Sequence, residues 1–188
     1  MGSNVYNMIS LDVDGANMPA MVCGPEGDEP HPALVVAMHM PAHAGLEGAQ
    51  FTENMIQHFA DSGYLCVVPF IFHRFPLKKD RQEKRASFDD KEIHADQEAA
   101  YQWLIDNENV DSDSIGIYSN DDGNPSPEDA DAEEQALIAA GIEYEFHRYD
   151  GAGHAFMNPT SSRDPDPYRY QASEDSWNKQ LAFLARHL

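Results

Sequence analysis

Two continuous apolar runs constrain the fold of this chain more than any other feature of its sequence. Residues 33–38 read Ala-Leu-Val-Val-Ala-Met, and residues 64–72 form a second run that contains one proline and no charged side chain. A strand with one face in water alternates apolar and polar residues, whereas a strand of a parallel sheet is covered on both faces and is apolar throughout. Each run therefore predicts a buried strand in a sheet that has helices on both sides.

Helical periodicity fills the interval between the two runs. Its apolar side chains recur at the spacing of one helix face, and they are Phe51, Met55, Ile56 and Phe59. Gly63 follows at the place where a helix commonly ends in a left-handed residue. The interval predicts an amphipathic helix that covers the sheet.

The same two periodicities predict the other elements. An opening hairpin is expected from two strand patterns that flank a turn of Asp, Gly, Ala and Asn. Beyond residue 72, helical and strand patterns alternate. In chain order the expected elements are strands at 5–13 and 18–23, a helix at 93–104, a turn at 111–114, a strand at 115–118, a helix at 127–140, a strand at 142–149 and a closing helix with an apolar stripe over 177–188.

This order of elements indicates the α/β class. We expect a three-layer sandwich built on a mostly parallel sheet with an N-terminal antiparallel hairpin. A chain of 188 residues is typical of one domain, so residues 1–188 are expected to form a single α/β domain. Trp103 and Trp177 lie on apolar helical stripes and are predicted to pack in the core.

The charge of the chain limits its partners. Asp and Glu number 33 and Lys and Arg number 12, which gives a net charge of −21. Nucleic acids and anionic membrane surfaces are therefore not expected as partners, because both are bound through clustered cations. The simpler explanation of the acidity is a solubilising surface, and the alternative is a salt-adapted host. No leader sequence is recognisable and no apolar run reaches the length of a membrane span, so we expect a cytoplasmic protein.

A histidine and an acidic turn carry the chemical signal. His154 stands in the glycine-rich stretch Gly151-Ala-Gly-His154-Ala-Phe156, directly after the expected strand at 142–149. Asp121 and Asp122 lie upstream in the acidic turn Asn120-Asp-Asp-Gly-Asn-Pro125. A histidine oriented by a carboxylate activates the nucleophile of a hydrolytic triad. The usual third member, Ser or Cys within G-x-[SC]-x-G, occurs nowhere in the sequence.

These pieces together resemble the dienelactone hydrolase family of α/β-hydrolases. The likeness runs through the opening hairpin, the strand that leads into His39, the passages at 59–73 and 110–116, the turn at 124–129 and the stretch at 151–156. The resemblance implies a reduced α/β-hydrolase fold with the nucleophile, the acid and the histidine in that order along the chain. By motif match His154 takes the histidine position and Asp122 the acid position, with Asp121 as the second choice for the acid. The loop containing His39 and Met40 matches the segment that supplies part of the family's oxyanion hole.

The chain departs from the family pattern in two places. The strand at 115–118 leads almost at once into the acidic turn, so the segment that bears the family's nucleophile is missing between them. Met40 stands where the family often has a glutamate that controls the nucleophile. Ser119 is the best-placed hydroxyl because it directly follows the strand. Asp121 is a further candidate, as an aspartate nucleophile of the kind that dehalogenases and epoxide hydrolases use.

Other potential ligands and nucleophiles in the sequence have simpler interpretations. Cys23 and Cys66 lie within strand patterns, which predicts buried thiols with no disulfide and no nucleophilic role. His39 and His43 have the spacing of metal ligands on a helix, but Pro41 between them makes a helix improbable. We therefore expect no metal site and no cofactor. The remaining histidines of interest are predicted to lie on the surface or in loops, and these are His73, His94 and His187.

Three hypotheses about function remain open at this stage. The first is a hydrolase for a small-molecule ester or lactone, in which His154 is the base and Asp122 orients it. The second is a catalytically inactive descendant that serves as an oligomeric binding or scaffold protein. Loss of a segment should uncover a sheet edge and apolar helix surface, so we expect a homo-oligomer. The third is that the chain is a natural or engineered deletion of a longer hydrolase.

Overall fold

A computed structural model of the chain describes residues 6–27, 29–37, 50–76, 79–80, 83, 86–87, 89–106, 110–118, 127–141, 144–149, 156–157 and 167–188. The chain divides into two compact units, Met1–Asp121 together with Leu188 and Asp122–His187. This division does not test the expectation of one domain over residues 1–188, which stays a prediction. The first unit contains every strand of the described residues, and the second contains two helices.

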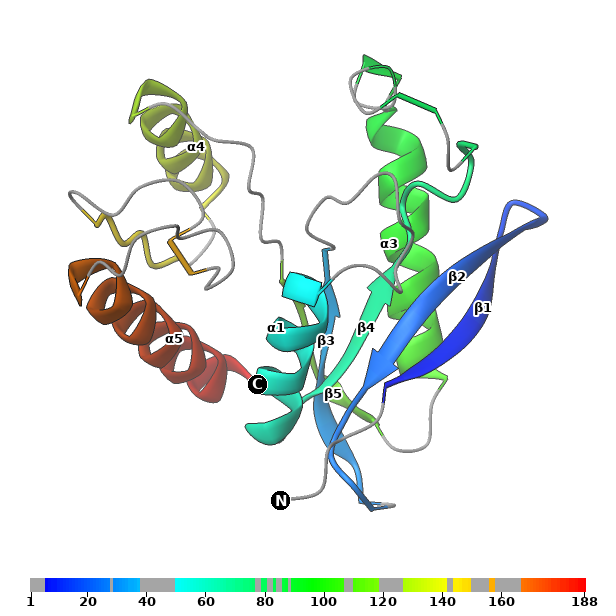
Figure 1. Cartoon of the computed structure of the whole chain (residues 1–188), viewed down its shortest axis with the longest axis horizontal. Helices are drawn as coiled ribbons and strands as arrows, with labels where there is room; N and C mark the ends of the chain where they lie inside the picture. The colour runs from blue at the N-terminus through cyan, green and yellow to red at the C-terminus, as the bar shows by residue number, and fades with distance from the viewer. Residues whose placement is uncertain are drawn as a thin grey trace. The chain divides into compact units, whose positions relative to one another are not determined.

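The first unit is built on a five-stranded sheet with the order β1-β2-β4-β3-β5 (Figure 1). Its strands are β1 (Asn7–Val13), β2 (Ala16–Cys23), β3 (His31–Val36), β4 (Leu65–Pro69) and β5 (Val110–Tyr118). β2 is antiparallel to both of its neighbours, whereas β3 is parallel to both β4 and β5. The α/β class and the antiparallel opening hairpin are confirmed, and the parallel pairing is confined to β4, β3 and β5.

The turn of the hairpin consists of two residues with positive φ. Asp14 has a φ of 54° and Gly15 a φ of 81°, which is the left-handed backbone that two-residue hairpin turns require. The Gly15 backbone N–H also donates to the Asp12 carboxylate at 3.2 Å. This local hydrogen bond fixes the register in which Val13 pairs with Ala16.

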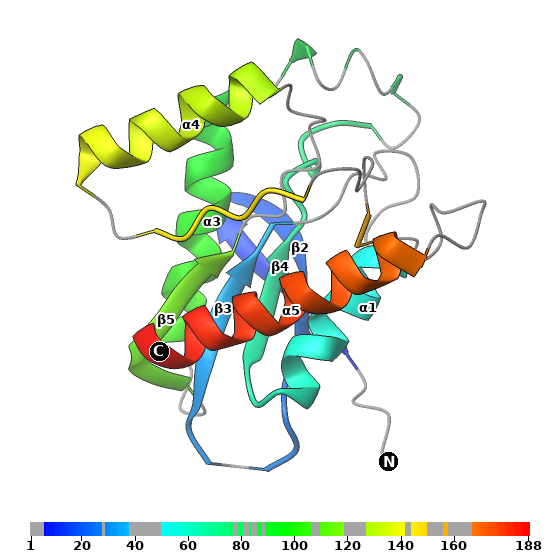
Figure 2. The same cartoon turned by 90° about the vertical axis from the view of Figure 1, so that its left-hand side faces the viewer.

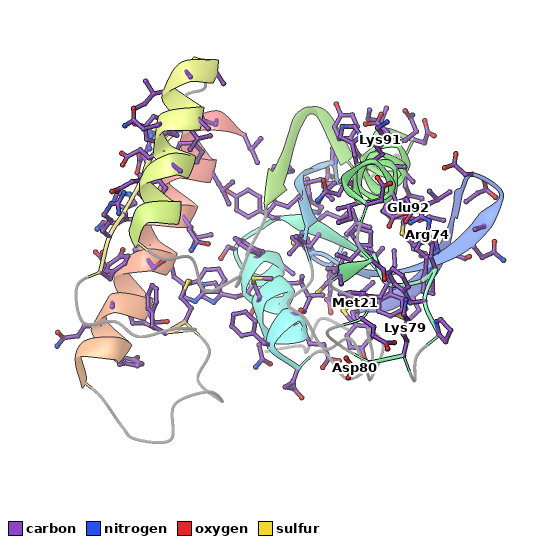
Figure 3. The ribbon with its side chains drawn as sticks, turned by 90° about the horizontal axis from the view of Figure 1, so that it is seen from above. Met21, Arg74, Lys79, Asp80, Lys91 and Glu92 are labelled. Atoms are coloured by element: carbon purple, nitrogen blue, oxygen red, sulfur yellow. The ribbon has the colours of Figure 1, made fainter. Side chains whose placement is uncertain are left out.

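Helices cover both faces of the sheet, as the two apolar runs predict. Helix α3 (Asp90–Ile105) packs against β1, β3, β4 and β5, and helix α1 (Gln50–Asp61) packs against β2 and β4 (Figures 1 and 3). Because successive side chains of a strand point to opposite faces, alternate residues of one strand pack into the two apolar layers on either side of the sheet. The layer under α3 contains Ala33, Val35, Leu65, Val67, Ala100 and Leu104 among its buried side chains. Leu34, Val36, Cys66 and Val68 point the other way and are buried as well.

Local signals set the ends of the two helices of this unit. The chain leaves α1 through Gly63, which has a φ of 101° and whose N–H donates to the Ala60 carbonyl at 3.0 Å. Asp89 caps the start of α3, where its carboxylate accepts from the Lys91 N–H at 2.8 Å. Both helices were expected from periodicity and both are confirmed.

One expected turn is wrong. Residues 111–114 were expected to form a turn, and they form the first half of β5. The pairing of β5 with β3 is irregular between His31 and Ala33. His31 pairs with Val110 and Ala33 pairs with Ile115, so residues 111–114 are the extra residues of a bulge between these two paired points.

The second unit contains helices α4 (Pro127–Ala140) and α5 (Pro167–His187) (Figure 2). Both were expected from the sequence. The strand expected at 142–149 is not formed over residues 144–149, which are neither strand nor helix. A strand needs a neighbouring strand for its backbone hydrogen bonds, and the described part of this unit contains no strand. Side chains of the segment instead contact the two helices.

Candidate functional site

The six residues that the sequence singles out all lie outside the described residues. They are His39, Met40, Ser119, Asp121, Asp122 and His154. The structure neither brings them together nor separates them. The structure describes the ends of β3 and β5, which precede His39 and Ser119 in the chain. It also describes the side chains around the end of β4, at the same edge of the sheet.

The parallel strands define the edge at which a ligand is expected. The carboxyl ends of β3, β4 and β5 lie on one edge of the sheet (Figure 2), and open α/β sheets bind ligands outside that edge. Val36, the last residue of β3, is the register partner of Tyr118, the last residue of β5. The chain therefore leaves the sheet at two directly adjacent points.

The segment after β4 is the described part of this edge. Its first residue is fixed to the neighbouring strand, because the Phe70 N–H donates to the Pro19 carbonyl at 2.9 Å. The chain then turns, and the His73 N–H donates to the Phe70 carbonyl at 2.9 Å. Phe72 is fully buried within the turn. The backbone and this aromatic anchor together present His73 and Arg74 towards α3.

A buried carboxylate of α3 receives both of these side chains. The His73 ring Nε2 lies 3.1 Å from Asp96 Oδ1, and the Arg74 Nη1 lies 2.7 Å and 2.8 Å from the two Asp96 oxygens. The Asp96 side chain has no exposed surface and that of His73 is 3% exposed. Arg74 extends outward from this contact, with its Nε 4.0 Å from the Glu92 carboxylate (Figure 3).

The geometry of this cluster indicates a structural role. A histidine next to a carboxylate has the form of a base and its orienting group, but the His73 side chain is only 3% exposed, which favours a structural contact. A buried carboxylate without a partner is strongly unfavourable, and the guanidinium of Arg74 compensates the charge of Asp96. The cluster therefore ties the turn after β4 to α3 and supports the shape of the edge.

Sequence reasoning missed this cluster. His73 was expected on the surface or in a loop, and it lies in the turn after β4 with a buried ring. His94 and His187 are exposed, as expected. The available signal was Asp96, which lies on the apolar face of α3 between Ile93 and Ala100. A carboxylate on a buried helix face requires a cationic or hydrogen-bonding partner, and the sequence alone does not identify which one.

The two cysteines are unsuited to nucleophilic chemistry, in agreement with their expected role. Cys23 and Cys66 are register partners in β2 and β4, and both are free and buried. Burial, with a smaller contribution from Asp61, raises the pKa of the Cys23 thiol to about 11. Burial also raises the pKa of Cys66 well above the ordinary value. The reactive form of cysteine is the thiolate, and both thiols stay protonated near neutral pH.

Metal and membrane features can be judged only over the part of the chain that the structure describes. Within it, no three side chains among His, Cys, Asp and Glu gather in the way that a metal ion needs. His39 and His43 lie outside that part. None of the described helices combines the length and the apolar character required to cross a membrane.

Comparison with known proteins connects the fold to a family. The sequence profile of the Dienelactone hydrolase family matches residues 18–119 and 117–188. Two solved structures resemble the chain over nearly its whole length. A candidate dienelactone hydrolase from Klebsiella pneumoniae is 17% identical with a TM-score of 0.76, and the match covers 98% of this chain and 99% of that one. A dienelactone hydrolase-like promiscuous phosphotriesterase from metagenomic libraries is 14% identical with a TM-score of 0.76, and 99% of each chain is covered.

More distant likeness extends to larger enzymes. The dipeptidyl peptidase 4 of Porphyromonas gingivalis is 12% identical with a TM-score of 0.65, and the match covers all of this chain but 36% of that one. No curated protein matches the sequence. At these identities the structural likeness shows the fold alone, so the family rests on the sequence profile.

Proposed function

The chain belongs to the dienelactone hydrolase family, and on this premise we propose that it hydrolyses a small ester or lactone with His154 as the general base and Asp122 as its orienting carboxylate. The observation that carries the proposal is the extent of the family match. Its second segment, 117–188, contains both the acidic turn and the glycine-rich stretch with His154. Its first segment, 18–119, contains His39, Met40 and Ser119.

The proposed chemistry needs few groups. His154 takes a proton from the attacking hydroxyl as the new C–O bond forms at the ester carbonyl. Asp122 holds the imidazole in the tautomer that accepts this proton and stabilises the imidazolium. Backbone N–H groups of the loop at 39–40 stabilise the oxyanion. When the tetrahedral intermediate collapses, the C–O bond to the leaving group breaks and His154 returns the proton to that oxygen.

The strand topology supports this arrangement. In the sequence, Ser119 directly follows Tyr118, the last residue of β5. Met40 is four residues beyond Val36, the register partner of Tyr118. The proposed hydroxyl and the proposed oxyanion loop therefore both begin at neighbouring points of the sheet edge where α/β folds bind their ligands.

The attacking group is the open part of the proposal. The family match consists of two segments that overlap at residues 117–119, at the end of β5, and this is where the sequence lacks the family's nucleophile segment. We propose water, activated by His154, as the attacking group. Ser119 or Asp121 would instead form a covalent acyl-enzyme. Intact mass spectrometry during turnover separates these routes. An acyl adduct that disappears in Ser119→Ala or in Asp121→Asn identifies that residue as the nucleophile. The absence of any adduct supports water as the attacking group.

Hydrolysis of 4-nitrophenyl acetate tests the function itself. We expect His154→Ala to lower kcat about 10²-fold or more, because general-base catalysis contributes about 10²–10⁴-fold. His94→Ala is the matched control, since His94 is an exposed histidine on α3 and its loss should leave the rate unchanged. If wild-type protein is no faster than His154→Ala, hydrolysis is rejected and the inactive scaffold becomes the better account.

We also propose that the chain forms a homo-oligomer. β5 is the last strand of the described sheet, and a strand at a sheet edge offers its backbone groups to another chain. The charge of −21 opposes close contact between copies, so association should strengthen as salt screens that charge. Sedimentation velocity at low and high salt measures this, and a monomer under both conditions would reject the proposal.

A further inference from the structure

The segment that carries His154 is flanked by two anchored side chains. Residues 150–155 lie between Tyr149 and Phe156 along the chain. On the first side, the Tyr149 hydroxyl donates to Asp175 Oδ2 of α5 at 2.7 Å. Lys179, one helical turn further along α5, places its Nζ 2.6 Å from the same oxygen and 5.3 Å from the centre of the Tyr149 ring. The start of the segment is thus fixed to one turn of α5.

The other side is fixed to the same turn. The Ser176 hydroxyl lies 3.4 Å from the Met157 sulfur, and the Gln180 amide nitrogen lies 3.6 Å from it. The Gln180 nitrogen is also 3.2 Å from Ser176 Oγ. Ser176 is one of the few buried polar residues of the described chain. Met157 is therefore held by two side chains of α5 that also contact each other.

The two anchors also meet directly. The rings of Tyr149 and Phe156 are 5.2 Å apart between centroids, with 46° between their planes. Four residues of α5 make the polar contacts, and they form two pairs at i, i+4 on one side of the helix. We name these four residues, Asp175, Ser176, Lys179 and Gln180, the α5 clamp.

The clamp contacts both ends of the glycine-rich stretch that carries His154. Glycine-rich segments have wide conformational freedom, so a catalytic group within one needs its ends fixed from outside. We propose that the α5 clamp positions His154, and that Asp175, Ser176 and Gln180 are positioning residues of the hydrolase. The catalytic part of this inference rests on the proposed function. The structural part rests only on the contacts of Tyr149, Phe156 and Met157.

The protonation states of the clamp suit its contacts. The hydrogen bond from Lys179, and next that from Tyr149, lower the pKa of Asp175 below its ordinary value. Burial, and then the contact with Asp175, raise the pKa of Tyr149. Near neutral pH the phenol keeps its proton and the carboxylate is charged, which is the combination that the hydrogen bond between them requires.

One buried acceptor atom of the clamp has no hydrogen-bond partner among the described residues. Gln180 Oε1 is buried, and among the described residues it has no hydrogen-bond donor. Buried amide oxygens are normally satisfied by protein or by ordered water.

The test compares two variants that open the clamp from opposite sides. Tyr149→Phe removes only the hydroxyl, and Gln180→Ala removes one of the two contacts to Met157. The histidine ring of residue 154 is followed by NMR in protein with isotope-labelled histidine, and its resonance is identified by its loss in His154→Ala. In the double variant we expect a shifted titration midpoint and a broadened resonance for His154. We also expect kcat to fall on the order of 10²-fold with KM nearly unchanged, because misplacement of a reacting group acts on the chemical step.

Arg186→Gln is the matched control, since Arg186 also joins α5 to the preceding segment, through Glu145, but takes no part in the clamp. Asp175→Asn keeps an oxygen acceptor for the Tyr149 hydroxyl and should keep more activity than Asp175→Ala. A His154 resonance and kcat that are the same in wild type and the double variant would overturn the inference. So would equal changes in Arg186→Gln.

The two proposals fail in different ways. A wild type without esterase activity, whose His154 resonance still changes in the double variant, rejects the hydrolase and keeps the clamp. An active wild type whose resonance and kcat are indifferent to Tyr149→Phe and Gln180→Ala rejects the clamp alone. If the double variant does not fold by circular dichroism, Tyr149→Phe alone decides, because it removes a single oxygen.

Discussion

The two units of the chain are stabilised by different means. The sheet unit has apolar side chains buried on both faces, and many of them, such as Val67, Phe59 and Leu104, have no exposed surface. Among the described side chains of the second unit, only Ala172 and Ser176 are buried. Its segment at 144–149 is joined to the helices by ion pairs and hydrogen bonds at the surface.

The fold of the sheet unit is therefore stabilised by apolar burial, whereas the unit that carries the proposed catalytic histidine is stabilised mainly by surface ion pairs and hydrogen bonds. Apolar burial contributes about 25 cal/mol per Å² and depends little on pH, whereas exposed ion pairs contribute little each and depend on the charge of both partners. Regions with few buried contacts open at the lowest free energy. The family's histidine motif lies in the unit of the second kind, so conditions that spare the sheet should still disturb the proposed site.

The two tryptophans make this comparison measurable. Trp103 lies on α3 and packs against the core of the sheet unit, and Trp177 lies half-buried on α5. With Trp177→Phe the remaining fluorescence reports the first unit, and with Trp103→Phe it reports the second.

The largest effect is expected from the core of the sheet unit. Phe59→Ala should lower the free energy of unfolding by about 3–5 kcal/mol, because a fully buried aromatic side chain leaves a cavity. Urea unfolding followed by Trp103 measures it. Ile138→Ala on α4 is the control, since Ile138 is 52% exposed and its loss should change little. Equal losses for both variants would contradict the contrast between the units.

A smaller loss is expected at the buried polar cluster. Asp96→Asn should cost about 1–3 kcal/mol, because it leaves the donors of His73 and Arg74 without their charged acceptor. Glu92→Gln, 4.0 Å from Arg74 and half exposed, should stay within about 0.5 kcal/mol. The same unfolding experiment applies, and an Asp96→Asn protein as stable as Glu92→Gln would show that the cluster does not support the edge.

Alkaline pH should weaken the sheet unit through its thiols. The Cys23 pKa is about 11 in the folded chain and ordinarily 9.0, so between these values the unfolded chain releases a proton that the folded chain keeps. Stability is therefore complete below about pH 9 and falls as pH rises towards 11. The urea midpoint reported by Trp103 should fall across this window, and less so when both cysteines are alanine. A midpoint with the same slope in that variant would contradict the assignment.

Acid should weaken the second unit, with a smaller effect than the preceding changes. The pKa of Asp175 is lowered, chiefly by the hydrogen bond from Lys179, and that of Glu145 is lowered, chiefly by the hydrogen bond with His147. Each contribution is present above the ordinary carboxyl pKa, about 4, and is lost as pH falls through the lower folded value. Unfolding reported by Trp177 should show this loss. Asp175→Asn and Glu145→Gln together should flatten it, and an unchanged slope would refute it.

The reach of sequence reasoning follows the same division. The apolar runs predicted β3 and β4, and periodicity predicted α1 and α5, because burial and helix pitch leave a pattern in neighbouring residues. The partners of Asp96 lie 22 and 23 positions away, so no local pattern revealed them. Residues 144–149 carry a strand pattern but have no partner strand in the described chain. Whether a partner strand is present depends on residues elsewhere in the chain, which the local pattern does not report. The catalytic assignments of His154 and Asp122 stay predictions.

The most direct test of the account is the pH–rate profile of ester hydrolysis in wild-type protein and in His154→Ala. We predict that kcat/KM of the wild type rises with pH as the general base loses its proton, and that this rise is absent from the variant. Profiles that coincide over the whole range would show that the imidazole at position 154 takes no part in hydrolysis.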